Sequence, residues 1–438
     1  MKSYNKFVFH LIFIFLAIFP FLIKPFGSFL NSTYTKFIYL TFFVLILWFI
    51  IAIQIVFKKH FPIHFKTLGL QVLVLFLLAV LLATMFSLDP ELSFFGGRHK
   101  YIGFIAWFSF ISLFLVSYFY IPIEKYKGLL KVLVIISAFV GLYGIIQHHF
   151  PQILYKREYG EFVRSWGFFD NSNHFASYII LMILPTMVFF LLAKKRWEKG
   201  LYLLTAGLLF ASLLYTASRS GYLAVFIGWL FLGVYVIWKK RELWKRWAIL
   251  SFTFLMIFIA VNLSENAHIL HRLGSIGEDL VTVIAMEDND GAGSYRWGIW
   301  KNTINIIGEN WLNGSGPSTF RLVYPGLEET SILDNSHNEY LEIAYTIGAP
   351  GLILFVAFLL IVLLNGWKAL SKLHGDEKLL QFGILLTIIC YLIKMFFNIG
   401  VIPVAPYFYV FLGFYYHYSL MILKESEESK IMLSKMVG

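Results

Sequence analysis

The chain has 438 residues, of which 59% are hydrophobic and only 14% are charged, whereas a soluble domain carries about 25% charged residues. This composition, with 47 Phe and many long apolar runs, excludes an ordinary soluble enzyme and indicates a membrane protein in contact with the lipid bilayer. The formal charge of +11 would suggest nucleic-acid binding in a soluble protein. In a membrane protein, basic residues fix the orientation, so we expect no nucleic-acid partner.

Apolar runs of about the length that crosses a bilayer recur along the chain. Only helices can form so many separate spans, because each segment must satisfy its own backbone hydrogen bonds. The first run lacks a small-residue cleavage site, so we expect it to be retained as a helix. We therefore predict an all-α membrane protein with about twelve transmembrane helices, near residues 7–26, 37–57, 68–86, 101–121, 129–148, 174–193, 200–217, 220–238, 247–263, 350–366, 379–398 and 403–423.

The loops between these runs predict the orientation. Short loops on the side of the N-terminus carry basic clusters such as Lys194-Lys195-Arg196 and Lys239-Lys240-Arg241. Such clusters mark the cytoplasmic side. We expect a multi-pass protein of the cytoplasmic membrane with both termini in the cytoplasm.

The stretch 264–349 is far longer than any other loop and rich in turn residues. Loops of this length usually carry function. We predict three parts: transmembrane helices 1–9 in residues 1–263, a partly helical extracytoplasmic catalytic loop in 264–349, and transmembrane helices 10–12 with a short cytoplasmic tail in 350–438.

His337 is the candidate base in this loop. The preceding residues, Asp334-Asn335-Ser336, favour helix N-caps, so a short helix should begin near His337 and stop at Gly348 and Pro350. An ordinary histidine titrates near pH 6.5 and suits general-base chemistry. A polar residue at a solvated helix end would fit this spacing at least as well.

Three arginines are candidates for holding a phosphate. Arg219 lies in a very short turn between two spans, where a charge is expensive, and it could pair with a phosphate or extend to lipid headgroups. Arg296 begins a Trp-rich helical stretch that could present it to anions or be a plain amphipathic helix. Arg321, after a Gly-rich turn, is a weaker candidate of the same kind.

Two polar clusters at the ends of predicted spans could bind a sugar or a headgroup. Residues 96–100 include Arg98, and residues 170–174 include Asn173 and His174. Ordinary loop ends and helix caps would look the same.

Metal and nucleotide motifs are weak throughout the sequence. His148-His149 and the pair His268 and His271 have no further ligands at metal-site spacing, and Cys390 is the single cysteine. No P-loop or dinucleotide fingerprint is present. We expect no metal site and no cofactor.

Two motifs resemble those of the O-antigen ligases. His337-Asn338, followed after nine residues by Gly348-Ala349-Pro350-Gly351, resembles the H-[NSQ]-x9-G-x-x-[GTY] pattern of that family. Residues 219–223, RSGYL, resemble its R-x3-L element. The specific part of the resemblance covers roughly residues 290–351, and it points to the superfamily of ligases and polymerases rather than to one member.

The resemblance implies transfer of a glycan from a polyprenyl diphosphate carrier to a glycan or lipid acceptor on the outer face of the membrane. His337 would be the general base, and Arg219 and Arg296, with Arg321, would hold the diphosphate. Asn338, Arg98, Asn173 and His174 would be substrate contacts. The implied chemistry is metal-independent, and attack opposite the leaving group would invert the anomeric centre.

Three alternatives remain at this point. The enzyme could polymerise lipid-linked repeat units, or it could glycosylate proteins. The Lys-, Ile- and Phe-rich composition is typical of an AT-rich genome and compatible with a Gram-positive host, where the product would be a teichuronic acid or a capsule. A transporter or lipid-linked glycan flippase usually has two related halves, and no internal repeat is evident here.

Overall fold

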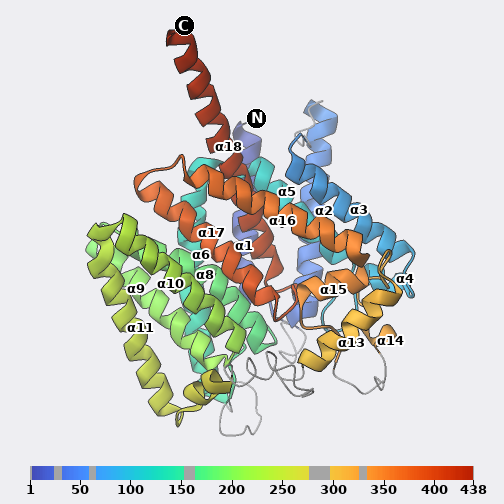
Figure 1. The fold of residues 1–438 in the computed structure, drawn as a ribbon, viewed down its shortest axis with the longest axis horizontal. Helices are drawn as coiled ribbons and strands as arrows, with labels where there is room; N and C mark the ends of the chain where they lie inside the picture. The colour runs from blue at the N-terminus through green and yellow to red at the C-terminus, as the bar shows by residue number, and fades with distance from the viewer. Residues whose placement is uncertain are drawn as a thin grey trace.

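A computed structural model describes residues 2–23, 32–58, 66–151, 163–275, 296–324 and 333–437. Within these ranges the chain forms helices, turns and loops and no strand, as Figure 1 shows. The predicted all-α class is therefore confirmed.

A helix lies at each of the twelve predicted apolar segments. These helices are α1 (Lys2–Ile18), α2 (Ser32–Lys58), α3 (Leu68–Met85), α5 (Phe104–Tyr120), α6 (Ile123–His149), α8 (Ser172–Leu192), α9 (Arg196–Tyr215), α10 (Arg219–Lys239), α11 (Trp244–Ser264), α16 (Gly348–Leu370), α17 (Gly375–Met395) and α18 (Ala405–Val437). Eight helices among the described residues are long and apolar enough to cross a membrane, namely α2, α3, α6, α8, α10, α11, α16 and α17. The chain is a multi-pass membrane protein, and the number twelve stays a prediction.

Helix α8 lies at the centre of the bundle. Of its apolar window 94% is buried, compared with 28% for α2 and for α11. It packs against α6, α9, α10 and α17, while α18 packs against α5 and α16. A helix that is apolar all round is buried, which explains the central place of α8. The exposed apolar faces of α2 and α11 suit contact with lipid.

Short helices gather at one end of the bundle. They are α4 (Pro90–Phe95), α13 (Arg296–Glu309), α14 (Phe320–Val323) and α15 (Glu339–Thr346). The two chain ends lie at the opposite end of the bundle (Figure 1). The prediction of short helices within 264–349 is confirmed for the described part, and the assignment of this end to the outer face stays a prediction.

The Gly-rich turn between α13 and α14 joins the short helices at this end of the bundle by backbone hydrogen bonds. The backbone N–H groups of Ser315 and Gly316 donate to the carbonyls of Tyr345 and Thr346 at 2.8 and 2.9 Å. Gly314 and Gly316 have φ of +67° and +100°, a region that glycine enters without strain. The turn therefore fixes α15 against the rest of the 296–324 segment.

Candidate active site

His337 lies in the loop just before α15 and not in its first turn, which corrects the predicted helix start. The N-cap is Asn338, whose Oδ1 accepts the backbone N–H groups of Tyr340 and Leu341 at 3.0 and 3.1 Å. Asn335, one of the expected caps, instead accepts the N–H of His337 at 2.8 Å. This bond accompanies a left-handed backbone at His337, with φ of +53°.

Buried hydrogen bonds hold this loop in place. Glu342 Oε2 accepts both the backbone N–H and the hydroxyl of Ser336 at 2.9 Å, and Glu342 Oε1 accepts the Tyr345 hydroxyl at 2.7 Å. Trp300 of α13 donates from Nε1 to the carbonyl of Ser336 at 3.0 Å. Burial raises the pKa of Glu342, and these hydrogen bonds to its carboxylate oppose the rise.

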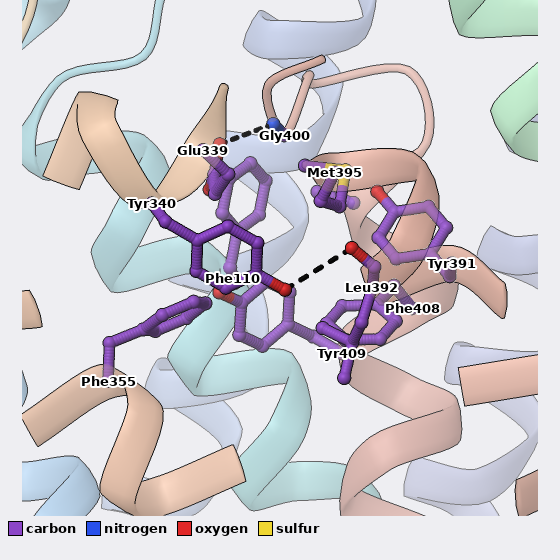
Figure 2. Close-up of a pocket in the computed structure, with 11 residues that line it drawn as sticks. Phe110, Glu339, Tyr340, Phe355, Tyr391, Leu392, Met395, Gly400, Phe408 and Tyr409 are labelled. Atoms are coloured by element: carbon purple, nitrogen blue, oxygen red, sulfur yellow. Dashed lines mark hydrogen bonds between the residues drawn. The ribbon is translucent and has the colours of Figure 1, made fainter. Parts of the chain in front are cut away.

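Glu339 ties the same loop to the segment between α17 and α18. Its backbone N–H donates to the carbonyl of Asn398 at 2.9 Å, and its Oε2 accepts the N–H of Gly400 at 2.6 Å. The side chain borders a small apolar cavity of about 20 Å³ that also contacts Tyr391 and Tyr409 (Figure 2). Burial in this apolar setting raises the pKa of Glu339 to about 8.

Burial, together with nearby positive charges, keeps the imidazole of His337 neutral. Burial, followed by the positive charges of Lys100 and Arg296, lowers the pKa of His337 to about 4, and Asp334 partly opposes this. Asp334 itself forms an ion pair with Lys100. At neutral pH the ring can therefore accept a proton.

Each of the two predicted polar clusters contributes one residue that interacts electrostatically with His337. His174 interacts electrostatically with His337 and with Lys100. From residues 96–100, however, Lys100 faces the site, while the predicted Arg98 is exposed. Asn173 also lies nearby in the same helix, where its Oδ1 accepts the hydroxyl of Ser218 at 2.8 Å.

Three arginines surround the turn between α9 and α10. Arg219 begins α10 and donates from Nη1 to Ser275 Oγ at 2.9 Å. Arg164 donates to the carbonyl of Thr216 at 2.8 Å, and Arg272 donates to the carbonyl of Ala217 at 3.1 Å. Burial, and then the charge of Arg272, lowers the pKa of Arg164. We call Arg164, Arg219 and Arg272 the arginine cluster.

Lys394 connects the arginine cluster with the surroundings of His337. It is fully buried on α17, and its Nζ donates to Ser218 Oγ at 3.0 Å and to Ser220 Oγ at 2.7 Å, on either side of Arg219. Its charge interacts with Arg164 and Arg296, and also with His174. Lys394 thus interacts both with the arginine cluster and with residues around His337.

Residues 204–356 match the family model described as O-antigen ligase. The match covers about a third of the chain, so this segment is similar to the O-antigen ligase family, in agreement with the resemblance of the two motifs. The matched family implies a glycosyltransferase-like enzyme. The matched segment runs from α9 into α16 and contains Arg219, Arg272, Arg296 and His337. No curated protein matches the chain.

Residues outside the family match complete the site. Arg164, Lys100, His174 and Lys394 all lie beyond residues 204–356, yet they interact with residues inside that segment. Of these, the sequence singled out only His174 as a site residue. Arg272 was also missed, because its target carbonyl at Ala217 is 55 residues away and no local pattern marks it.

Two further predicted site residues, Asn338 and Arg321, lie at the start of α15 and on α14. Asn338 uses Oδ1 as the cap of α15, so a substrate contact would have to come from its Nδ2 group. Arg321 lies exposed on α14. Its assignment to the diphosphate stays a prediction.

An apolar cavity adjoins the arginine cluster. It has a volume of about 430 Å³ and lies between α9, α10 and α11. Its lining includes Leu214, Tyr222, Phe254 and Leu273, which follows Arg272 directly. Tyr222 interacts electrostatically with Arg164 and Arg272. A molecule with an anionic head and an apolar tail could contact both regions at once.

Proposed function

We propose that the protein is a membrane glycosyltransferase that moves a glycan from a polyprenyl diphosphate carrier to an acceptor hydroxyl on the outer face of the cytoplasmic membrane. The observation that carries this proposal is the buried His337 with Lys100 and Arg296 acting on it, and with Lys394 joining its surroundings to the arginine cluster. Proton acceptance and diphosphate binding are the two tasks that this reaction requires.

His337 acts as the general base. As the acceptor oxygen attacks the anomeric carbon, its proton passes to the imidazole of His337. The new C–O bond forms while the bond from the anomeric carbon to the diphosphate oxygen breaks, with inversion. Base assistance of this kind is worth about 10²–10⁴-fold in rate.

The arginines stabilise the leaving group. The departing polyprenyl diphosphate gains negative charge, which fixed cations stabilise without reorganising. Arg219 and Arg296 are the predicted ligands, and Arg164 and Arg272 join them because they lie at the same turn as Arg219. A guanidinium binds phosphate oxygens through two parallel hydrogen bonds, which suits a metal-independent site.

Donor binding also strengthens the base. In the free protein, Lys100 and Arg296 contribute to the low pKa of His337. A bound diphosphate brings negative charge into this field, so it raises the pKa of His337 in the complex. The imidazole becomes a stronger base when the donor is in place.

The apolar cavity between α9, α10 and α11 receives the first part of the polyprenyl tail. Its lining residue Leu273 follows Arg272, so a lipid whose diphosphate contacts Arg272 could enter the cavity directly. This arrangement explains why a glycan-transferring site would be built into a membrane domain.

The direct test uses the purified full chain with a lipid-linked glycan donor and an acceptor. We expect His337→Ala to lower transfer by about 10²–10⁴-fold while donor binding persists. Arg272→Met should weaken donor binding. Normal transfer by a correctly inserted His337→Ala protein would overturn the proposal.

A polymerase that joins lipid-linked repeat units is the second candidate. It is favoured by the Lys-, Ile- and Phe-rich composition, which is typical of an AT-rich genome and compatible with a Gram-positive host. Both candidates use the same donor and differ in the acceptor. Deletion of the gene followed by sizing of the surface glycans separates them. Single repeat units on the carrier would indicate a polymerase, and full-length unattached chains would indicate a ligase.

A further inference from the structure

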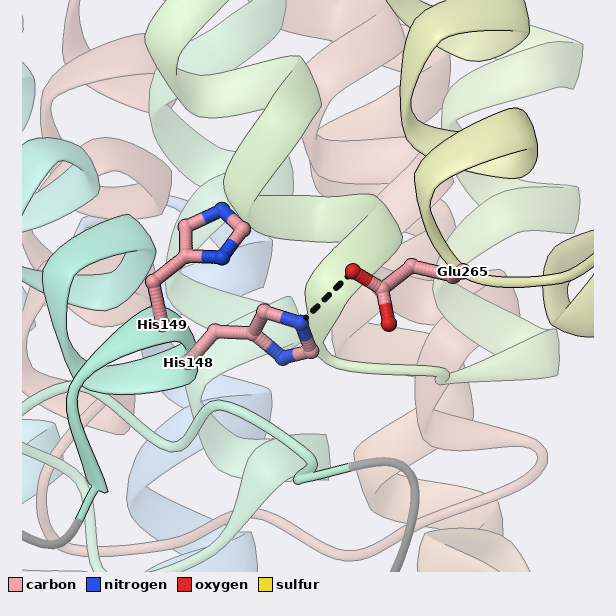
Figure 3. A group of neighbouring side chains, drawn as sticks. All are labelled: His148, His149 and Glu265. Atoms are coloured by element: carbon pink, nitrogen blue, oxygen red, sulfur yellow. Dashed lines mark hydrogen bonds and ion pairs between the residues drawn. The ribbon is translucent and has the colours of Figure 1, made fainter.

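We propose that His148, His149 and Glu265 form a binding site for a divalent transition-metal ion, with Zn²⁺ as the expected occupant. Figure 3 shows the two imidazoles at the end of α6 facing the carboxylate that follows α11. One potential ligand atom from each residue lies within 4.8 Å of the others. This site is independent of the proposed transferase chemistry.

The hydrogen bonds of His148 define its tautomer. Nδ1 lies 2.5 Å from the carbonyl oxygen of Val163. A carbonyl can only accept, so Nδ1 carries the hydrogen, and a neutral ring then presents the lone pair of Nε2 on its other side. An N–H to backbone carbonyl bond is the usual way in which proteins orient a metal-binding histidine.

The lone pair of Nε2 faces another acceptor. Glu265 Oε1 lies 3.0 Å from Nε2 of His148, so a cation or a proton must lie between them. Two atoms that are each about 2.0–2.1 Å from one zinc ion lie about 3.3 Å apart at a tetrahedral angle. This pair therefore needs only a small adjustment to accommodate zinc, whereas the set of three ligand atoms, which lie within 4.8 Å of one another, would have to close further around the ion.

Tyr215 organises the other side of the site. Its ring stacks on His148 with centroids 4.1 Å apart, and its hydroxyl lies 3.1 Å from Nε2 of His149. Two histidine nitrogens and one carboxylate oxygen form a common zinc ligand set, which leaves a fourth position for water. The sequence missed this site because Glu265 is 117 residues from His148.

The surrounding charges moderate the affinity. Glu265 is the anion of the site, and it interacts electrostatically with His149 and with His268. Arg164 and Arg272 also act on His268, so positive charge lies near enough to oppose the binding of a cation. We expect the affinity for the metal ion to depend on the three ligands and to be lowered by the positive charges of these two arginines.

A bound ion would brace the end of α6 against the end of α11, and Tyr215 at the end of α9 packs on the two histidines. Val163, whose carbonyl orients His148, precedes Arg164, which reaches the carbonyl of Thr216. The metal therefore has a structural role. It holds the segment that places Arg164 in the arginine cluster.

The test uses the full chain without a histidine tag, treated with a chelator and then titrated with Zn²⁺, with Mg²⁺ as a comparison. Thermal unfolding reports stabilisation, and the visible spectrum with Co²⁺ reports tetrahedral coordination. Glu265→Gln is a mild variant, because its amide can still donate to Nε2 of His148. His149→Ala removes an exposed ring, and His271→Ala is the matched control in the same region.

We expect one Zn²⁺ per chain, an increase in melting temperature with Zn²⁺ but not with Mg²⁺, and a Co²⁺ spectrum of the tetrahedral type. Glu265→Gln and His149→Ala should each weaken binding more than the about 10–100-fold typical for loss of an outer partner, whereas Tyr215→Phe should fall within that range. His271→Ala should bind as the wild type does. Absence of saturable binding, or binding as tight as that of the wild type in both Glu265→Gln and His149→Ala, would overturn the site and leave a protonated His148 paired with Glu265.

Discussion

Lys394 donates a hydrogen bond from Nζ to Ser220 Oγ at 2.7 Å, beside Arg219 at the start of α10. The lysine is fully buried on α17 and also contacts Ser218. Through this contact α17 fixes the turn that carries Arg219. The relationship explains why a charged side chain is placed inside a predicted membrane span, where charges usually mark functional sites.

Replacement of Lys394 by Met should destabilise the protein and weaken donor binding. The substitution removes both hydrogen bonds from the buried serines, and each lost hydrogen bond costs about 0.5–1.5 kcal/mol. Thermal unfolding and donor affinity are the measurements. Ser220→Ala removes one of the two contacts and should have a smaller effect on both. Equal stability and affinity in Lys394→Met and wild type would contradict the positioning role.

The pH dependence of transfer should show a low acid limb in the free enzyme. The pKa of His337 is lowered to about 4, so its base form is present above that pH and is lost as the pH falls through it. The profile of kcat/KM reports the free enzyme and should decline near pH 4, whereas that of kcat reports the donor complex and should decline at a higher pH. Coincident limbs near pH 6.5 would refute the electrostatic account.

Lys100→Met should move the acid limb of kcat/KM to higher pH. Lys100 is the first charge that lowers the pKa of His337, and its removal leaves the opposing Asp334 unpaired. Both changes favour the protonated imidazole. Arg98→Met is a suitable control, because Arg98 is exposed on the same loop. If the acid limb of kcat/KM stays at the same pH in Lys100→Met, the charge of Lys100 does not act on the imidazole of His337.

Arg272→Lys should reduce donor affinity by about 10-fold. Lysine keeps the charge but loses the two-pronged geometry that matches phosphate oxygens. The expected loss corresponds to about 1.4 kcal/mol, close to the lower end of the range for one hydrogen bond to a charged group. Arg196→Lys, at the opposite end of α9, provides the control. If both variants bind the donor alike, the arginine cluster is not the diphosphate site.

The stability of the protein should depend on the protonation of Glu339. Its pKa rises from 4.5 to about 8 on burial, so its stabilising effect is full below pH 4.5 and is lost as the pH rises through about 8. One such group changes the free energy of unfolding by up to about 1.4 kcal/mol per pH unit within this window. Glu339→Gln still accepts from Gly400 and should flatten the curve of melting temperature against pH. An unchanged slope would disprove the assignment.

The helices were predictable because apolar length and backbone satisfaction decide them locally. The His337 region was found by its motif, yet the helix start was placed wrongly. Four consecutive residues there, 334–337, precede Asn338, and three of them with Asn338 can cap a helix. In the structure Asn338 is the N-cap of α15. The Asn335 side chain instead accepts the His337 N–H, and the Ser336 hydroxyl donates to Glu342.

The cationic surroundings of the site were only partly predictable. Arg219 and Arg296 were marked by their loops, whereas Arg164 and Arg272 reach carbonyls 52 and 55 residues away. Lys394 stood out as a charge in an apolar run, but its partners at Ser218 and Ser220 follow only from the packing of α17 on α10. Such pairings depend on tertiary structure, which residue spacing does not encode.

The central claim is that His337 takes the proton while the arginine cluster holds the donor. The most direct measurement compares turnover and donor affinity separately in His337→Ala and Arg272→Met, each verified as correctly inserted. We predict that His337→Ala lowers kcat by about 10²–10⁴-fold with unchanged donor affinity, and that Arg272→Met weakens donor affinity. Normal turnover in the His337→Ala protein would contradict the account.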